Sequence, residues 1–152
     1  KVCLDLSNTF KPNTQYESLP KEVINAKEQR QNILSIRSLK LPNHKIIPNV
    51  GSFFKNPVIS KSKLDELVIK FPNIKSYLFK KNRHKVSAAW LIEEAGLKGS
   101  KKGDCGISDL HSLVFYNFSD QSDFLVTYSL EVKDIIQEKF GIILDYEPSI
   151  FS

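Results

Sequence analysis

Apolar side chains recur at helical spacing over 122–140, a stretch long enough to form one side of a small domain. The residues on this apolar face are Leu125, Tyr128, Val132, Ile135 and Ile136. Gly141 follows directly, and glycine readily takes the left-handed backbone conformation that ends a helix. The pattern therefore predicts a long helix over Ser122–Phe140 that packs one side on a core.

Three further segments predict shorter helices. Over Lys61–Lys70, Ser60 or Ser62 can cap the start and Pro72 ends the element, and the apolar positions are Leu64, Leu67, Val68 and Phe71. Ser87 caps a second helix that Gly96 ends, and its shared face is Ala88, Leu91, Ile92 and Ala95. A more irregular apolar pattern predicts a third helix over Pro20–Ser38. Such a helix should end before Pro42, because proline opposes helical backbone angles at the residue before it.

Short apolar runs between these helices predict strands at Val58–Ile59, Leu113–Tyr116 and Ile142–Leu144. Alternation over Val2–Leu6 predicts another strand with one buried face, and Cys3 is expected to be buried there as a small hydrophobic residue. Lys80–Lys85 is the densest run of charge in the chain. We interpret it as a solvated turn, with a phosphate site as the alternative.

Composition narrows the classes of protein. The 152 residues are 41% hydrophobic, enough for one core, and no apolar run approaches the roughly 20 residues that span a bilayer. The net charge of +5 comes mostly from scattered lysines, which favours anionic ligands without indicating nucleic acid. Cys3 and Cys105 are too few and too far apart for a disulfide framework or a metal site, and both are expected to be reduced.

The stretch Asn49–Pro57 combines a Gly51–Ser52 turn, two aromatic residues and a polar tip. Glycine accepts backbone angles that other residues avoid, so such a turn can present the Ser52 hydroxyl while Phe53 and Phe54 anchor it in a core. Lys55 and Asn56 would supply donors for an anionic or amide-bearing ligand. One Gly-Ser pair is a weak signal, so the residues alone favour an ordinary loop that enters a strand.

With its flanks, this stretch resembles the signature of the UDP-N-acetylenolpyruvoylglucosamine reductases, the MurB flavoenzymes of peptidoglycan synthesis. The segment Lys85–Gly99, which reads KVSAAWLIEEAGLKG, resembles a second family block, and His111–Asn117 with Phe140–Ile142 and Glu147 resembles a third. The likeness runs from about Val2 to the last residue. It implies an NADPH- and FAD-dependent UDP-N-acetylmuramate dehydrogenase acting on UDP-N-acetylglucosamine enolpyruvate, cytoplasmic, bacterial and monomeric, without nucleic acid or membrane.

The resemblance also implies roles for single residues. Ser52 would donate a proton to the substrate, and Glu147 would stabilise the enolic species. The family usually carries Glu-Pro-Glu where this chain has Asp145-Tyr146-Glu147, so a shifted register would place Ser149 in the catalytic position. Tyr16, Lys40 and Asn56 would hold the diphosphate. Alternatively, Tyr16 is a packing residue and Lys40 one of many surface lysines.

His111 matches a family position that reaches towards the uridine, although a lone histidine beside a strand is more often structural. The resemblance implies an α+β fold, a mainly antiparallel sheet with three or four packing helices, preceded by a strand-loop-helix arm. We expect residues 1–48 to end a middle domain, 49–145 to form the substrate-binding domain and 146–152 to return towards a flavin domain. The flavin-binding half lies upstream in the family, so the chain is expected to be an inactive carboxy-terminal fragment. A non-catalytic sugar-nucleotide-binding domain is the alternative.

Overall fold

The computed structural model describes residues 2–3, 5, 9–12, 19, 22 and 25–150. The chain forms two compact units, Lys1–Leu41 and Pro42–Ser152, and each is described by itself. In the part of the chain that the structure describes, no helix is long and apolar enough to span a membrane.

The first unit contains helix α1, Ala26–Lys40. It starts later than the predicted Pro20–Ser38 helix, because Asn25 is the capping residue and its side chain accepts a hydrogen bond from the Glu28 amide at 2.9 Å. Pro20 itself lies outside the described residues. The predicted strand over Val2–Leu6 is not found at the residues described there, and Cys3 is exposed, so its predicted burial is wrong. Val2, Cys3 and Asp5, the residues described in this segment, have no strand pairing, and a strand needs a partner for its backbone groups.

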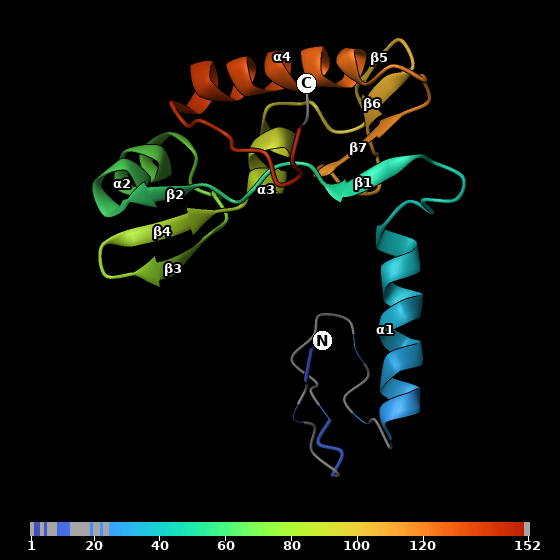
Figure 1. Ribbon diagram of the computed structural model, residues 1–152. Helices are drawn as coiled ribbons and strands as arrows, with labels where there is room; N and C mark the ends of the chain where they lie inside the picture. Colours follow the sequence, from blue (N-terminus) through green and yellow to red (C-terminus); the bar gives the residue numbers. More distant parts are fainter. Residues whose placement is uncertain are drawn as a thin grey trace. The chain divides into compact units, whose positions relative to one another are not determined.

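The second unit is an α+β fold with two antiparallel sheets and three helices (Figure 1). One sheet has the order β1 (Asn49–Ser52), β7 (Val114–Asn117), β6 (Cys105–Ile107) and β5 (Lys101–Lys102). The other has the order β2 (Val58–Ser60), β4 (Arg83–Val86) and β3 (Ser76–Lys80). Its helices are α2 (Lys61–Lys70), α3 (Ala88–Glu94) and α4 (Ser122–Phe140). The predicted α+β class, with antiparallel pairing and packing helices, is confirmed.

Local signals account for the three helices of this unit. Ser60 and Ser87 cap α2 and α3 by accepting hydrogen bonds from Lys63 and Trp90 amides, each at 3.2 Å. After α3, Gly96 has a φ of 76°, which lets the Leu97 amide donate back to the Ile92 carbonyl at 3.0 Å. The predicted bounds of α2 and α4 are both confirmed.

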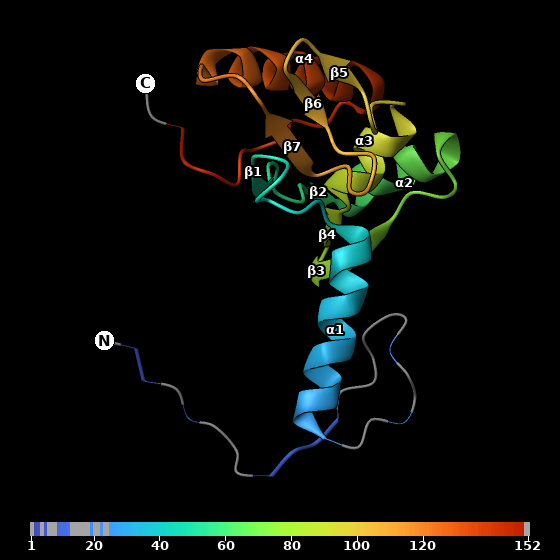
Figure 2. The ribbon, with the colours of Figure 1, turned by 90° about the vertical axis from the view of Figure 1, so that its right-hand side faces the viewer.

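The core lies where α3 and α4 meet the larger sheet, and Figure 2 shows α4 running across β6 and β7. Its most deeply buried large side chains are Phe54, Phe115, Phe140, Leu91, Ile92, Ile107, Ile136 and Leu144. Val68 and Ile135 were predicted to face inward, but they are 41% and 39% exposed. Each lies at the margin of the buried stripe of its helix.

The predicted strand at Ile142–Leu144 is absent from the described fold. Ile142 and Leu144 are buried while Ile143 is 62% exposed, so the segment has the alternation of a strand without its pairing. Its one bridge lies further on, between Phe54 and Tyr146. Of Lys80–Lys85, predicted as a solvated turn, only Lys81 and Asn82 form the tight connection, with Asn82 at a φ of 60°; Lys80 ends β3, and residues 83–85 belong to β4.

Candidate active site

The predicted turn at Ser52 is a bulged strand end. Strand β1 pairs with β7 through Asn49 opposite Tyr116 and Ser52 opposite Val114, and the register shifts between these pairs. Gly51 lies in the shift with a φ of 78°, a conformation that strains any residue with a Cβ. Ser52 is exposed, and no described residue hydrogen-bonds its hydroxyl. The strand therefore ends with a serine oxygen directed to no protein partner.

The two aromatic residues after Ser52 anchor it, as predicted. Phe53 and Phe54 are only 4% and 1% exposed, and their rings meet edge to face at 5.4 Å. Phe53 also stacks on Phe115 at 4.8 Å, and its amide donates to the Leu113 carbonyl at 2.8 Å. Ser52 is thus attached to a rigid core on its C-terminal side.

Glu147, near the far end of the chain, lies beside the segment that follows Ser52. The Lys55 amide donates to the Asp145 carbonyl at 2.8 Å, and the Glu147 amide donates to the Phe53 carbonyl at 3.0 Å. These two bonds form the bridge between Phe54 and Tyr146. The residue next to Ser52 therefore contacts Glu147 directly through the backbone.

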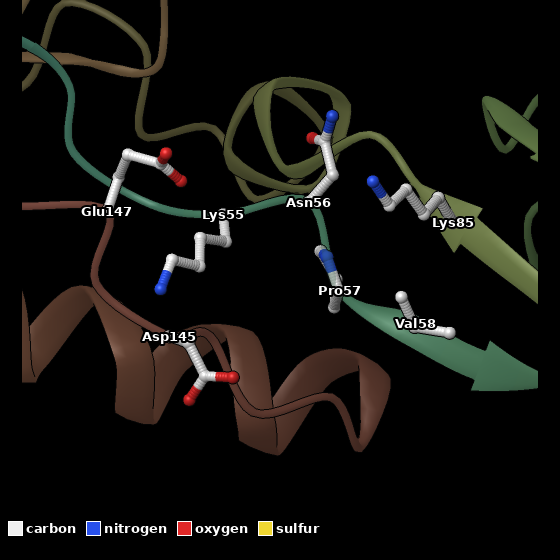
Figure 3. Close-up of a pocket in the computed structure, with 7 residues that line it drawn as sticks. All are labelled: Lys55, Asn56, Pro57, Val58, Lys85, Asp145 and Glu147. Carbon is white, nitrogen blue, oxygen red and sulfur yellow. The ribbon is translucent and has the colours of Figure 1, made fainter. Parts of the chain in front are cut away.

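An open hollow of about 560 Å³ lies beside this bridge. Its lining residues are Lys55, Asn56, Pro57, Val58, Lys85, Asp145 and Glu147. In Figure 3 the Lys55 side chain lies between the two carboxylates, and Lys85 approaches from beyond Asn56. We call this the bridge hollow. Two cations, two carboxylates and an amide suit a polar ligand that needs several hydrogen bonds.

Asn56 is held by two partners. Its Oδ1 accepts from the Ala88 amide at the start of α3, at 2.9 Å, and its Nδ2 donates to the Tyr77 hydroxyl at 3.3 Å. An amide nitrogen carries two hydrogens, so one donor remains for a ligand. The side chain is therefore oriented before any ligand arrives.

Ser149 lies on a different surface. It lines a second, mostly apolar hollow of about 300 Å³ with Val50, Phe53 and Leu125, among others. Glu147 and Ser149 are thus separated into two hollows, and only Glu147 shares one with Lys55 and Asn56. Which of the two is catalytic stays a prediction.

Ser52 is not among the residues that line the bridge hollow, although Phe53 beside it bonds Glu147 through the backbone. The remaining predicted residues do not line it either. Tyr16 lies outside the described residues. Lys40 is the last residue of α1, in the first unit, and is exposed. His111 is half-buried at the start of the loop before β7, where its Nδ1 accepts from the Leu113 amide at 3.2 Å. The contact that His111 makes in this structure is therefore a structural hydrogen bond within its own loop.

Sequence reasoning missed Lys85 and Asp145 as lining residues. Lys85 was included in the solvated charge run, but β4 pairs it with Val58 at the entrance of the bridge hollow. Val86 is fully buried, and side chains alternate between the two faces of a strand. This alternation could have indicated that Lys85 belongs to a strand and not to the turn. Asp145 is placed by the Lys55 backbone bond, for which the sequence carries no local signal.

A pH dependence follows from His111. Burial lowers the pKa of its imidazole. The charge of Glu93 raises this pKa and that of Lys98 lowers it, and the net shift is downward. A lowered folded-state pKa means that the stability His111 contributes is fully present above its ordinary value of 6.5 and is lost as the pH falls through the lowered value. We expect His111→Gln to lose less of its free energy of unfolding than the unaltered chain between about pH 7.5 and about pH 5.

Urea unfolding at both pH values measures this difference. His84→Gln, at a half-buried histidine in β4, is the matched control and should follow the unaltered chain. If His111→Gln and the unaltered chain lose the same stability on acidification, His111 is not the titrating group.

Within the described ranges, no three His, Cys, Asp or Glu side chains gather as a metal site would require. The structure defines an α+β domain with an open polar hollow close to a bulged strand end. The family described as "UDP-N-acetylenolpyruvoylglucosamine reductase, C-terminal domain" matches residues 41–151, and the chain belongs to this family.

Three relatives show the extent of the likeness, and each is named UDP-N-acetylenolpyruvoylglucosamine reductase. The protein of Shewanella sediminis is 37% identical over 98% of this chain and 44% of its own length. That of Flavobacterium johnsoniae is 36% identical, over 96% and 42%, and that of Xanthomonas campestris 35% identical, over 85% and 37%. The chain therefore spans less than half the length of these relatives.

Proposed function

We propose that this chain is the C-terminal part of a reductase that converts UDP-N-acetylglucosamine enolpyruvate to UDP-N-acetylmuramate in peptidoglycan synthesis. Family membership and the names of the relatives support the reaction. The observation that carries the proposal is the backbone bond from Glu147 to Phe53, which joins the two predicted catalytic segments beside the bridge hollow.

The described residues do not fit the flavin's own site. Gly99, Gly103 and Gly106 lie in and beside the β5–β6 hairpin, whereas a phosphate-cradling glycine loop opens directly into a helix. We therefore place FAD on the part of the enzyme that this chain does not span, where, reduced by NADPH, it supplies the hydride.

This chain would then supply the proton for the substrate and the charged group that stabilises the enolic species. Ser52 holds its hydroxyl proton at a rigid strand end and donates it to C2 of the enolpyruvyl group. A serine hydroxyl is a weak acid near neutral pH, so it requires a cationic neighbour or a relay. Glu147 orders and stabilises the enolic species, and Lys55 beside it offsets the charge of two carboxylates in the bridge hollow.

Substrate binding would involve the oriented donor of Asn56 at the diphosphate. The roles of Lys40 and Tyr16 at that group stay predictions of the family resemblance. A lysine ammonium and neutral donors suit the spread negative charge of that group. We further propose a monomeric, cytoplasmic bacterial enzyme that binds neither nucleic acid nor membrane.

A chimera tests this function. In it, this chain replaces the matching segment of the Shewanella sediminis relative, so that the rest of that protein can supply the flavin. We expect the chimera to oxidise NADPH over repeated turnovers only when the enolpyruvyl substrate is present, and the 152-residue chain alone to be colourless and inactive. A folded, flavin-loaded chimera without substrate-dependent NADPH oxidation would favour a non-catalytic sugar-nucleotide-binding domain. Flavin absorbance at about 450 nm in the isolated chain would instead indicate a cofactor site here.

A further inference from the structure

The side chain of Tyr146, in the described stretch after α4 (the C-terminal segment, 141–150), has several contacts with the rest of its unit. Its ring stacks on Phe54 with centroids 5.4 Å apart and planes at 20°, and it meets Phe53 edge to face at 5.6 Å. The ammonium group of Lys133, on α4, lies 4.5 Å from its centroid. The ring is thus fixed between the anchor of Ser52 and the long helix.

The direction of the Tyr146 hydrogen bond follows from counting protons. Its hydroxyl lies 3.0 Å from the Oγ of Ser129, a fully buried residue of α4. Ser129 Oγ also lies 2.6 Å from the Val126 carbonyl, which can only accept. Ser129 therefore gives its proton to Val126, and Tyr146 donates to Ser129. Every polar atom of this pair has a defined role.

This anchored ring fixes the residues on either side of it. Successive side chains of an extended segment point to opposite faces, so with Tyr146 directed to α4, Asp145 and Glu147 turn the other way. Both line the bridge hollow, as Figure 3 shows. The backbone bonds at Asp145 and Glu147 flank the ring and close the same bridge.

We propose that Tyr146 is a positioning residue for Glu147, which sets the placement of that carboxylate by tying the C-terminal segment to Ser129 on α4. The catalytic part of this inference rests on the proposed function. The structural part rests on the contacts of the phenol alone.

Tyr146→Phe tests the placement, because it keeps the stacked ring and removes only the hydroxyl. Tyr128→Phe is the matched control, since Tyr128, which lies on α4, also bonds a serine hydroxyl, that of Ser100 at 2.6 Å, but lies outside the bridge hollow. We expect amide hydrogen exchange at Glu147 and Lys55 to speed up roughly 3- to 10-fold in Tyr146→Phe, and to stay unchanged in Tyr128→Phe. The 152-residue chain is the sample.

The same pair of variants in the chimera tests the consequence for catalysis. A misplaced carboxylate weakens a contact made as the enolic species forms, so kcat should fall about 10-fold while KM stays unchanged in Tyr146→Phe. Equal losses in the two variants, or a change in KM alone, would show a general structural role and overturn the inference.

The two arms separate the failures. If the unaltered chimera is inactive, the proposed function fails and the catalytic part of this inference with it. Exchange still decides the placement in that case. Unchanged protection of Glu147 and Lys55 in Tyr146→Phe overturns the placement, whatever the chimera does.

Discussion

Replacing Ser52 with alanine in the chimera is expected to reduce kcat by about 10²–10⁴-fold, the usual contribution of a general acid. The change removes one oxygen from an exposed side chain that has no partner among the described residues, so folding and flavin content should be unaffected. Substrate binding should also change little, because the proton is needed only as the transition state forms. Steady-state NADPH oxidation, with kcat and KM determined separately, measures the effect.

Two further serine variants control for trivial causes. Ser52→Cys keeps a donor at nearly the same place and should recover part of the rate. Ser62→Ala alters another exposed serine, in the first turn of α2, and should leave kcat unchanged. If Ser52→Ala keeps the rate of the unaltered chimera, Ser52 only ends a strand.

Glu147→Gln is expected to remove most turnover, because it withdraws a charge from the bridge hollow that is needed as the enolic species develops. Ser149→Ala should be nearly neutral, since Ser149 lines the other, mostly apolar hollow. The comparison of kcat/KM for the two variants measures which register places the functional residue.

Asp145→Asn serves as the matched control for charge, because Asp145 lines the same hollow as Glu147. A smaller loss in Asp145→Asn than in Glu147→Gln would assign the role to one carboxylate. Equal losses would show that the net charge of the hollow matters and not Glu147 itself. An inactive Ser149→Ala beside an active Glu147→Gln would reverse the assignment.

Elements with local signals could be predicted from the sequence. Helix α4 has both its apolar stripe and Gly141 as its end within one stretch of chain, and the serines that cap α2 and α3 are equally local. The burial of Phe53 and Phe54 was predictable for the same reason, since two adjacent large aromatic residues after a turn require a core.

Features that depend on distant partners could not be predicted. Ile142–Leu144 has the composition of a strand, but no described segment pairs with it. Helix α1 begins at Ala26, after its cap Asn25, and the sequence offers several residues in this stretch that could serve as the cap. Asp145 and Lys85 line the bridge hollow through backbone pairing with Lys55 and Val58. Pairing between segments so far apart in sequence leaves no periodic signal in either one.

The central claim is that Ser52 provides the proton for the substrate, and stopped-flow absorbance of the flavin in the Ser52→Ala chimera tests it most directly. Reduction of the flavin by NADPH and its reoxidation by the enolpyruvyl substrate are measured as separate half-reactions. The account predicts unchanged reduction and reoxidation slowed by about 10²–10⁴-fold. Reoxidation at the rate of the unaltered chimera, or equal slowing of both half-reactions, would contradict it.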